Sequence, residues 1–171
     1  MSDPTAAPWL SDDERTAWMA LSAVLTSLPP VIDAQLKRDV GINYFEYTIL
    51  SSLSEAPGRA IRMGSLAHLA AGSPSRLSHA VSRLEKHGWV ERRVSIDTAT
   101  ETRCVEAVLT DAGWDAVVAA APDHVREARR LVFDVLTPEQ VAQLATIGRK
   151  LLTAAAPHLV SCLGDRPPAA C

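Results

Sequence analysis

The segment between Ser73 and His87 carries side chains that can hydrogen-bond to phosphates and base edges. A helix turns by about 100° per residue, so this segment separates into two faces. The apolar face would contain Leu77, Ala80, Val81 and Leu84. The opposite face would carry hydroxyl, imidazole and cationic groups without a carboxylate: Ser75, His79, Ser82, Arg83 and Lys86, with Arg76 beside them. Arginine can bind guanine through two hydrogen bonds, and serine and histidine can reach bases or phosphates. The pattern predicts a helix that contacts the DNA major groove. The alternative is an ordinary amphipathic surface helix.

The elements before and within this segment fit a helix-turn-helix. Ser73 suits the N-cap, and Pro74 suits the first helical position. A shorter helix is expected from about Gly64 to Ala71, and Gly72 is expected to supply a positive φ in the turn. Another helix is expected over residues 43–55.

Two segments after the helix have the pattern of strands. They are Trp89–Ile96 and Arg103–Leu109, joined by a polar tip at residues 97–100. A helix-turn-helix followed by such a hairpin is a winged helix-turn-helix, whose wing reaches the minor groove or the phosphate backbone. Arg92 and Arg103 are therefore predicted to contact DNA, although Arg92 and Arg93 are also suited to keeping a strand edge soluble. The full predicted DNA-binding set is Ser73, Ser75, Arg76, Ser78, His79, Ser82, Arg83, Arg92 and Arg103.

The distribution of charge supports this prediction. The 171-residue chain has a net charge of −3, yet the segment Arg59–Arg93 holds seven basic and two acidic residues. That segment carries +5 and the remainder −8. A basic block on an acidic chain is typical of phosphate binding, and the alternative is a solvated charged surface.

Long helices are expected before and after the winged helix-turn-helix. Ser11 begins a capping box, and apolar residues then recur every three or four positions from Trp18 to Leu36, which is typical of helix-on-helix packing. Pro29 and Pro30 predict a kink or break in this first helix.

Two more helices are expected after the wing. Thr110 should cap one, kinked at Pro122, and Thr137 should cap the last, which ends near Ala155. We therefore predict a mainly α fold with a small β-wing in one domain. The DNA-binding lobe would cover 43–109, the dimerisation helices 11–38 and 110–155, and a flexible tail 156–171.

Several other classes of protein lack support in the sequence. There is no glycine-rich phosphate loop, nucleophile elbow or paired metal-ligand motif, so no catalytic residue, metal or cofactor is predicted. No secretory signal or membrane-spanning apolar run is found. Cys104, Cys162 and Cys171 are odd in number and widely spaced, which favours a reducing cytoplasm.

Several runs of residues resemble the multiple-antibiotic-resistance regulator (MarR) family. They extend over about residues 12 to 153, and they are Arg62–Ala67, Ser75–Glu85, Gly88–Arg93, Val108–Gly113 and Leu136–Gln140. The resemblance implies a homodimer that binds palindromic double-stranded DNA, often as a repressor. It also implies release by a small phenolic ligand, a metal or an oxidant.

The resemblance also places a ligand pocket between the dimerisation helices and the DNA-binding lobe. Trp18, Arg62 and His68 are candidates for its lining, and packing or surface roles are the alternative for each. The family's wing commonly carries Asp-x-Arg, where this chain has Glu101-Thr102-Arg103. Cys104 beside Arg103 leaves redox sensing open, and a metal-responsive regulator or a winged helix used for protein contacts are further alternatives.

Overall fold

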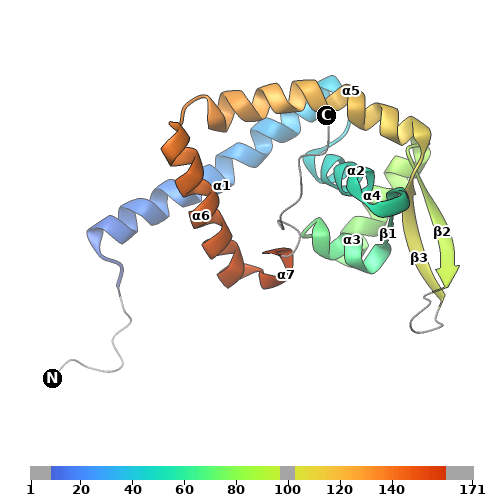
Figure 1. Cartoon of the computed structure of the whole chain (residues 1–171), viewed down its shortest axis with the longest axis horizontal. Coiled ribbons are helices and arrows are strands. Elements are labelled where there is room, and N and C mark those ends of the chain that lie inside the picture. The colour runs from blue at the N-terminus through green and yellow to red at the C-terminus, as the bar shows by residue number, and fades with distance from the viewer. Residues whose placement is uncertain (1–8, 97–102, 161–171) are drawn as a thin grey trace.

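The fold is mainly helical with one small sheet, as the sequence predicts. The computed structural model describes residues 9–96 and 103–160 (Figure 1). The elements in order are α1 (Asp12–Asp39), α2 (Tyr44–Glu55), the 3-10 turn η1 (Pro57–Arg59), β1 (Ala60–Arg62), α3 (Met63–Leu69), α4 (Pro74–Lys86), β2 (Val90–Ile96), β3 (Arg103–Leu109), α5 (Asp111–Ala128), the π-helical turn η2 (Arg129–Phe133), α6 (Pro138–Ala155) and α7 (Pro157–Val160). The predicted hairpin tip, Glu101, Thr102, Cys162 and Cys171 lie outside the described residues.

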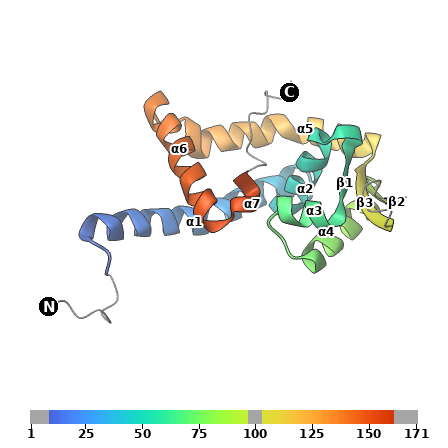
Figure 2. The ribbon, with the colours of Figure 1, turned by 60° about the horizontal axis from the view of Figure 1, so that its bottom comes forward.

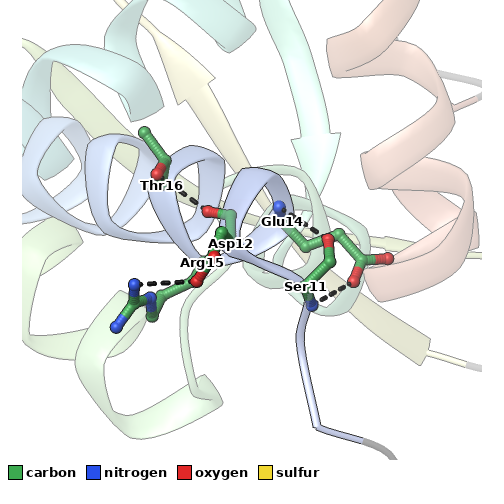
Figure 3. A network of polar contacts seen from close by, with 5 residues as sticks. All are labelled: Ser11, Asp12, Glu14, Arg15 and Thr16. Atoms are coloured by element: carbon green, nitrogen blue, oxygen red, sulfur yellow. Dashed lines mark hydrogen bonds and ion pairs between the residues drawn. The ribbon is translucent and has the colours of Figure 1, made fainter.

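The helices begin where the sequence places their caps. At the start of α1, the Ser11 hydroxyl accepts a hydrogen bond from the Glu14 amide, and the Glu14 carboxylate accepts one from the Ser11 amide (Figure 3). Thr137 forms the same reciprocal pair at α6, and Ser73 and Thr110 cap α4 and α5. These side chains satisfy amides that a helix start leaves without partners.

Of the kink or break expected at Pro29 and Pro30, the break does not occur. α1 continues from Asp12 to Asp39, and α5 likewise continues through Pro122. Proline already has a helical φ, and its cost is the lost amide hydrogen bond. Pro29 and Pro30 are exposed, as are Leu25 and Thr26 four residues earlier, so water can reach the carbonyls left without an amide partner.

The sheet has the strand order β1-β3-β2, and both pairings are antiparallel. Val90 pairs with Leu109 at the base of the hairpin, and Ile96 pairs with Arg103 at its far end. The base is buried, whereas Val94, Ile96 and Val105 are exposed. The wing is therefore anchored at one end and projects at the other.

The core lies in the lobe formed by α2, α3, α4 and the sheet. Its largest fully buried side chains are Leu36, Ile42, Ile49, Leu50, Leu53, Leu66, Leu77, Leu84 and Val81. Only the last part of α1 enters this core, and α6 buries none of its residues. In Figures 1 and 2, α1 and α5 run side by side away from the lobe, and α6 turns from the far end of α5 across α1, whose N-terminal part extends farther.

Apolar side chains are consequently exposed along the extended helices. Val24 and Leu25 on α1 and Leu144, Ile147 and Leu151 on α6 are all more than two-fifths exposed in the single chain. By length and composition alone, α1 is also apolar enough to cross a membrane, which the sequence did not lead us to expect.

The expected positive φ at Gly72 is also wrong. Ala71 takes that conformation, with φ 50°. Gly72 is needed for a different reason: a Cβ atom there would lie 2.6 Å from Cζ of Phe45. The glycine allows the turn to pack against an aromatic ring from α2.

Candidate nucleic-acid interface

The predicted two-faced helix is present as α4. Leu77, Ala80, Val81 and Leu84 are each at most 1% exposed, which confirms the apolar face. On the other side, the predicted contacts Ser75, Ser78, His79 and Arg83 are exposed, and Ser82 is half-buried. Burial of the apolar face fixes the rotation of α4, so its polar face must point outward.

Two predicted DNA-contacting residues lie at the start of α4. The Ser73 hydroxyl accepts a hydrogen bond from the Arg76 amide at 3.2 Å, so it serves as the helix cap. The Arg76 guanidinium carbon lies 4.0 Å from the centroid of the Phe45 ring. This cation–π contact holds the guanidinium against α2.

Arg83 is oriented by a residue that the sequence analysis did not select. Its Nε donates to Oε1 of Glu46 at 2.5 Å, and the Glu46 side chain is 7% exposed. The other carboxylate oxygen, Oε2, accepts from the Asn43 amide at 2.9 Å. Glu46 therefore caps α2 and holds Arg83 on α4 at the same time. The Asn-x-x-Glu spacing of a capping box was the signal available for it.

Arg92 on β2 reaches across to α4. It donates to the Ser78 carbonyl oxygen at 2.9 Å and to the Ser82 hydroxyl at 3.1 Å. It also forms an ion pair with Glu85. The structure thus brings three predicted DNA contacts, Ser78, Ser82 and Arg92, together in one network within the protein.

The outer part of the wing carries the other basic residues. Arg93 pairs with Glu106 across the strands at 3.2 Å. Arg103 is exposed opposite Ile96, at the far end of the described hairpin. Cys104 is a free, half-buried thiol whose Sγ lies 3.0 Å from the Ser95 hydroxyl.

A cavity of about 600 Å³ lies between α1, α2 and α4. Its lining includes both prolines of α1, Asp33, Tyr44 and Phe45, and the two α4 residues Arg76 and Arg83. The Asp33 carboxylate bonds to Lys37 at 2.7 Å and accepts from the Tyr44 amide at 2.9 Å. The Lys37 ammonium and that amide together lower the pKa of Asp33.

The three residues that the sequence analysis selected for a ligand pocket do not line this cavity. Trp18 is exposed on α1, and Arg62 is exposed at the end of β1. His68 lines a smaller cavity of about 280 Å³ between α3 and the last helices, with Ala156 and Leu159. Residues 157–160, part of the predicted tail, form α7 beside α3.

His124 is a partly buried titratable group at the junction of α5 and α2. Its ring centroid lies 4.4 Å from that of Tyr47 and 6.3 Å from that of Tyr44. Burial lowers the pKa of His124. Within residues 9–96 and 103–160, no group of three His, Cys, Asp or Glu side chains could hold a metal ion.

Solved structures show the same architecture. The chain is 39% identical to Sco3205, a MarR family transcriptional regulator from Streptomyces coelicolor solved in complex with DNA, with a TM-score of 0.81 over 90% of this chain and 94% of that one. It is 34% identical to AbsC, a MarR family transcriptional regulator from the same organism, with a TM-score of 0.75 over 90% and 98% of the two chains.

A curated relative in sequence is also a transcriptional regulator. The transcriptional repressor MprA of Escherichia coli strain K12 is 27% identical over 113 residues, which span 66% of this chain and 62% of MprA. No protein-family model matches the chain. The fold and its exposed basic helix are those of a winged helix-turn-helix transcriptional regulator. The chain belongs to the MarR family of transcriptional regulators.

Proposed function

We propose that this protein binds a palindromic double-stranded DNA operator as a homodimer and represses transcription. The observation that carries the proposal is the outer face of α4, which presents Ser75, His79, Arg83 and Lys86 while its apolar face is buried. Arg76 and Arg83 supply the main contacts, and Arg103 supplies a contact from the wing. A DNA-binding regulator works in the compartment that holds the DNA, so we place it in the cytoplasm.

The homodimer is supported by the apolar surface of the extended helices. An apolar groove of about 420 Å³ lies between α1 and the segment from Leu131 to Leu144. Val24, Val31 and Val135 line it. A second copy of α1 or α6 presents the same kind of surface, so each copy can cover the other. This arrangement would place the two α4 helices one DNA turn apart, about 34–36 Å.

Release by a small effector is supported by the cavity between α1 and α4. Its volume suits a small ligand, and it contains aromatic side chains beside the cations of Arg76 and Arg83. A phenolic or carboxylic aromatic compound would match that chemistry. Such a ligand would compete for the two arginines that the proposal assigns to DNA.

The proposal can be tested by selecting operators from a random pool of duplexes with the wild-type protein. The affinity for the selected duplex is then measured by fluorescence anisotropy at several salt concentrations. Arg83→Ala and Arg76→Ala should each weaken binding by about 1–3 kcal/mol. Arg15→Ala removes the same charge from the first turn of α1 and should leave the affinity unchanged.

The outcomes separate the proposal from a winged helix used for protein contacts. Binding to the operator should fall steeply with salt, because counterions are released from the phosphates. Failure to select any duplex, or a flat salt response for a duplex that is selected, would favour the protein-contact function. Addition of candidate phenolics to the complex tests the effector separately.

A further inference from the structure

The guanidinium of Arg92 is held by α4 along two turns of the helix. Nη2 donates to the Ser78 carbonyl oxygen at 2.9 Å, the Ser82 hydroxyl at 3.1 Å and the Ser78 hydroxyl at 3.4 Å. Nη1 pairs with the Glu85 carboxylate, and the two side chains are 28% and 31% exposed. Every one of these acceptors belongs to α4, the proposed recognition helix, which would enter the major groove.

These contacts define the orientation of the Arg92 guanidinium on α4 as well as its distance from the helix. The guanidinium is planar, and its donors point in fixed directions. A helix carbonyl cannot turn to follow a moving donor, because the helix holds it in place. Arg92 can therefore restrain the rotation of β2 relative to α4.

The position of Arg92 makes this orientation important for the rest of the wing. Arg92 pairs with Ala107 near the base of the hairpin, and Ile96 pairs with Arg103 at the far end. Four residues of strand span about 13 Å, so a rotation of about 10° at Arg92 would move Arg103 by about 2 Å. A shift of 2 Å exceeds what a hydrogen bond to DNA tolerates.

A direct DNA contact by Arg92 would give Glu85 a different role. In that case Glu85 would compete with phosphate for the guanidinium and repel the DNA. Removing its charge would then strengthen binding. If Glu85 instead holds Arg92 in place, removing its charge must weaken binding, so the two roles predict opposite signs.

We propose that Arg92 is a positioning residue, held by Glu85, that fixes the angle between the wing and the recognition helix. The proposal rests on the DNA binding proposed above. It makes Arg92 a determinant of operator specificity, because the fixed angle sets the distance between the major-groove contacts and the wing contact. The general attraction of the protein to phosphates does not depend on it.

The test compares Glu85→Gln and Arg92→Met with the control Arg93→Met. Arg93 is the next residue on β2, faces the other side of the sheet and pairs with Glu106. Each variant is titrated with the operator selected by the wild-type protein and with a shuffled duplex, at several salt concentrations. Glu85→Gln and Arg92→Met should both lower operator affinity by about 3- to 10-fold, because side chains must be ordered anew at each binding event. The dependence on salt should stay unchanged, and Arg93→Met should keep the ratio of operator to shuffled affinity.

The proposal is overturned if Glu85→Gln binds the operator as well as, or better than, the wild type. It is also overturned if Arg92→Met loses affinity equally for both duplexes with a weaker salt dependence, which is the behaviour of a phosphate contact. Circular dichroism checks the fold, and Arg92→Lys, which keeps the charge but loses the planar fork of donors, replaces Arg92→Met if that variant does not fold. A wild-type protein that selects no duplex would refute the proposed function itself.

Discussion

Gly113, in the first turn of α5, allows the closest approach between that helix and the start of the wing. A Cβ atom at Gly113 would lie 2.1 Å from the Trp89 carbonyl oxygen and 2.7 Å from Cδ1 of Leu109. The same carbonyl accepts a hydrogen bond from the Thr110 amide at 3.0 Å. Gly113→Ala must therefore displace backbone rather than a flexible side chain, and we expect it to destabilise the fold.

The size of the effect follows from opposing contributions. Alanine is favoured over glycine in a helix by about 1 kcal/mol. Overpacking costs about 1–3 kcal/mol, and weakening the hydrogen bond from Thr110 to Trp89 costs about 1 kcal/mol more. The net loss should be about 1–3 kcal/mol, which lowers the Tm of a chain of this size by about 3–10 °C. Gly64 in α3 is exposed and has no atom within 4 Å of its Cβ position, so Gly64→Ala should keep the helical gain and raise the Tm.

Thermal unfolding followed by circular dichroism measures both variants. All samples must have the same protein concentration, because the Tm of a dimer depends on it. The reasoning is refuted if Gly113→Ala unfolds at or above the wild-type temperature. Changes in Tm of opposite sign for the two glycine-to-alanine variants would show that packing, and not helix propensity, decides their stability.

Three further predictions concern the interface, the assembly and acid sensitivity. Glu46→Gln should weaken operator binding by about 1 kcal/mol and have no further effect in an Arg83→Ala background; equal losses in both backgrounds would show that Glu46 acts elsewhere. Leu144→Glu places a charge in the apolar groove and should give monomers in sedimentation at micromolar concentration, whereas a wild-type sedimentation pattern would contradict the proposed dimer. Because burial lowers the pKa of His124, the unfolded chain binds its proton more readily, so the free energy of unfolding should fall as the pH drops below the ordinary value of 6.5. His124→Phe should reduce the dependence of the free energy of unfolding on pH between pH 7.5 and 5.5. An unchanged dependence would contradict its assignment to His124.

Much of the fold could be predicted because its signals are local. The hydroxyl of Ser11 and its partner Glu14 are three residues apart, and Thr137 and Gln140 repeat the spacing at α6. The apolar positions of α4 likewise follow from the helical period alone. Each of these signals is complete within one or two turns of chain.

Several features could not be predicted, because residues distant in the sequence decide them. Gly72 packs against Phe45, which lies 27 positions earlier, so the sequence around the turn did not show why glycine is needed. Arg92 is held by residues of α4, and Arg83 by Glu46. Sequence reasoning could place such side chains on a face, but it could not show which neighbours compete for them.

The exposure of α6 has a consequence for the lifetime of the protein in a cell. α6 buries no residue within the single chain, so its folded state depends on the partner that the proposed dimer supplies. Dissociation at low concentration would leave this helix open to proteolysis. The rate of removal would then rise as the regulator becomes scarce, which makes its abundance respond more than proportionally to its synthesis.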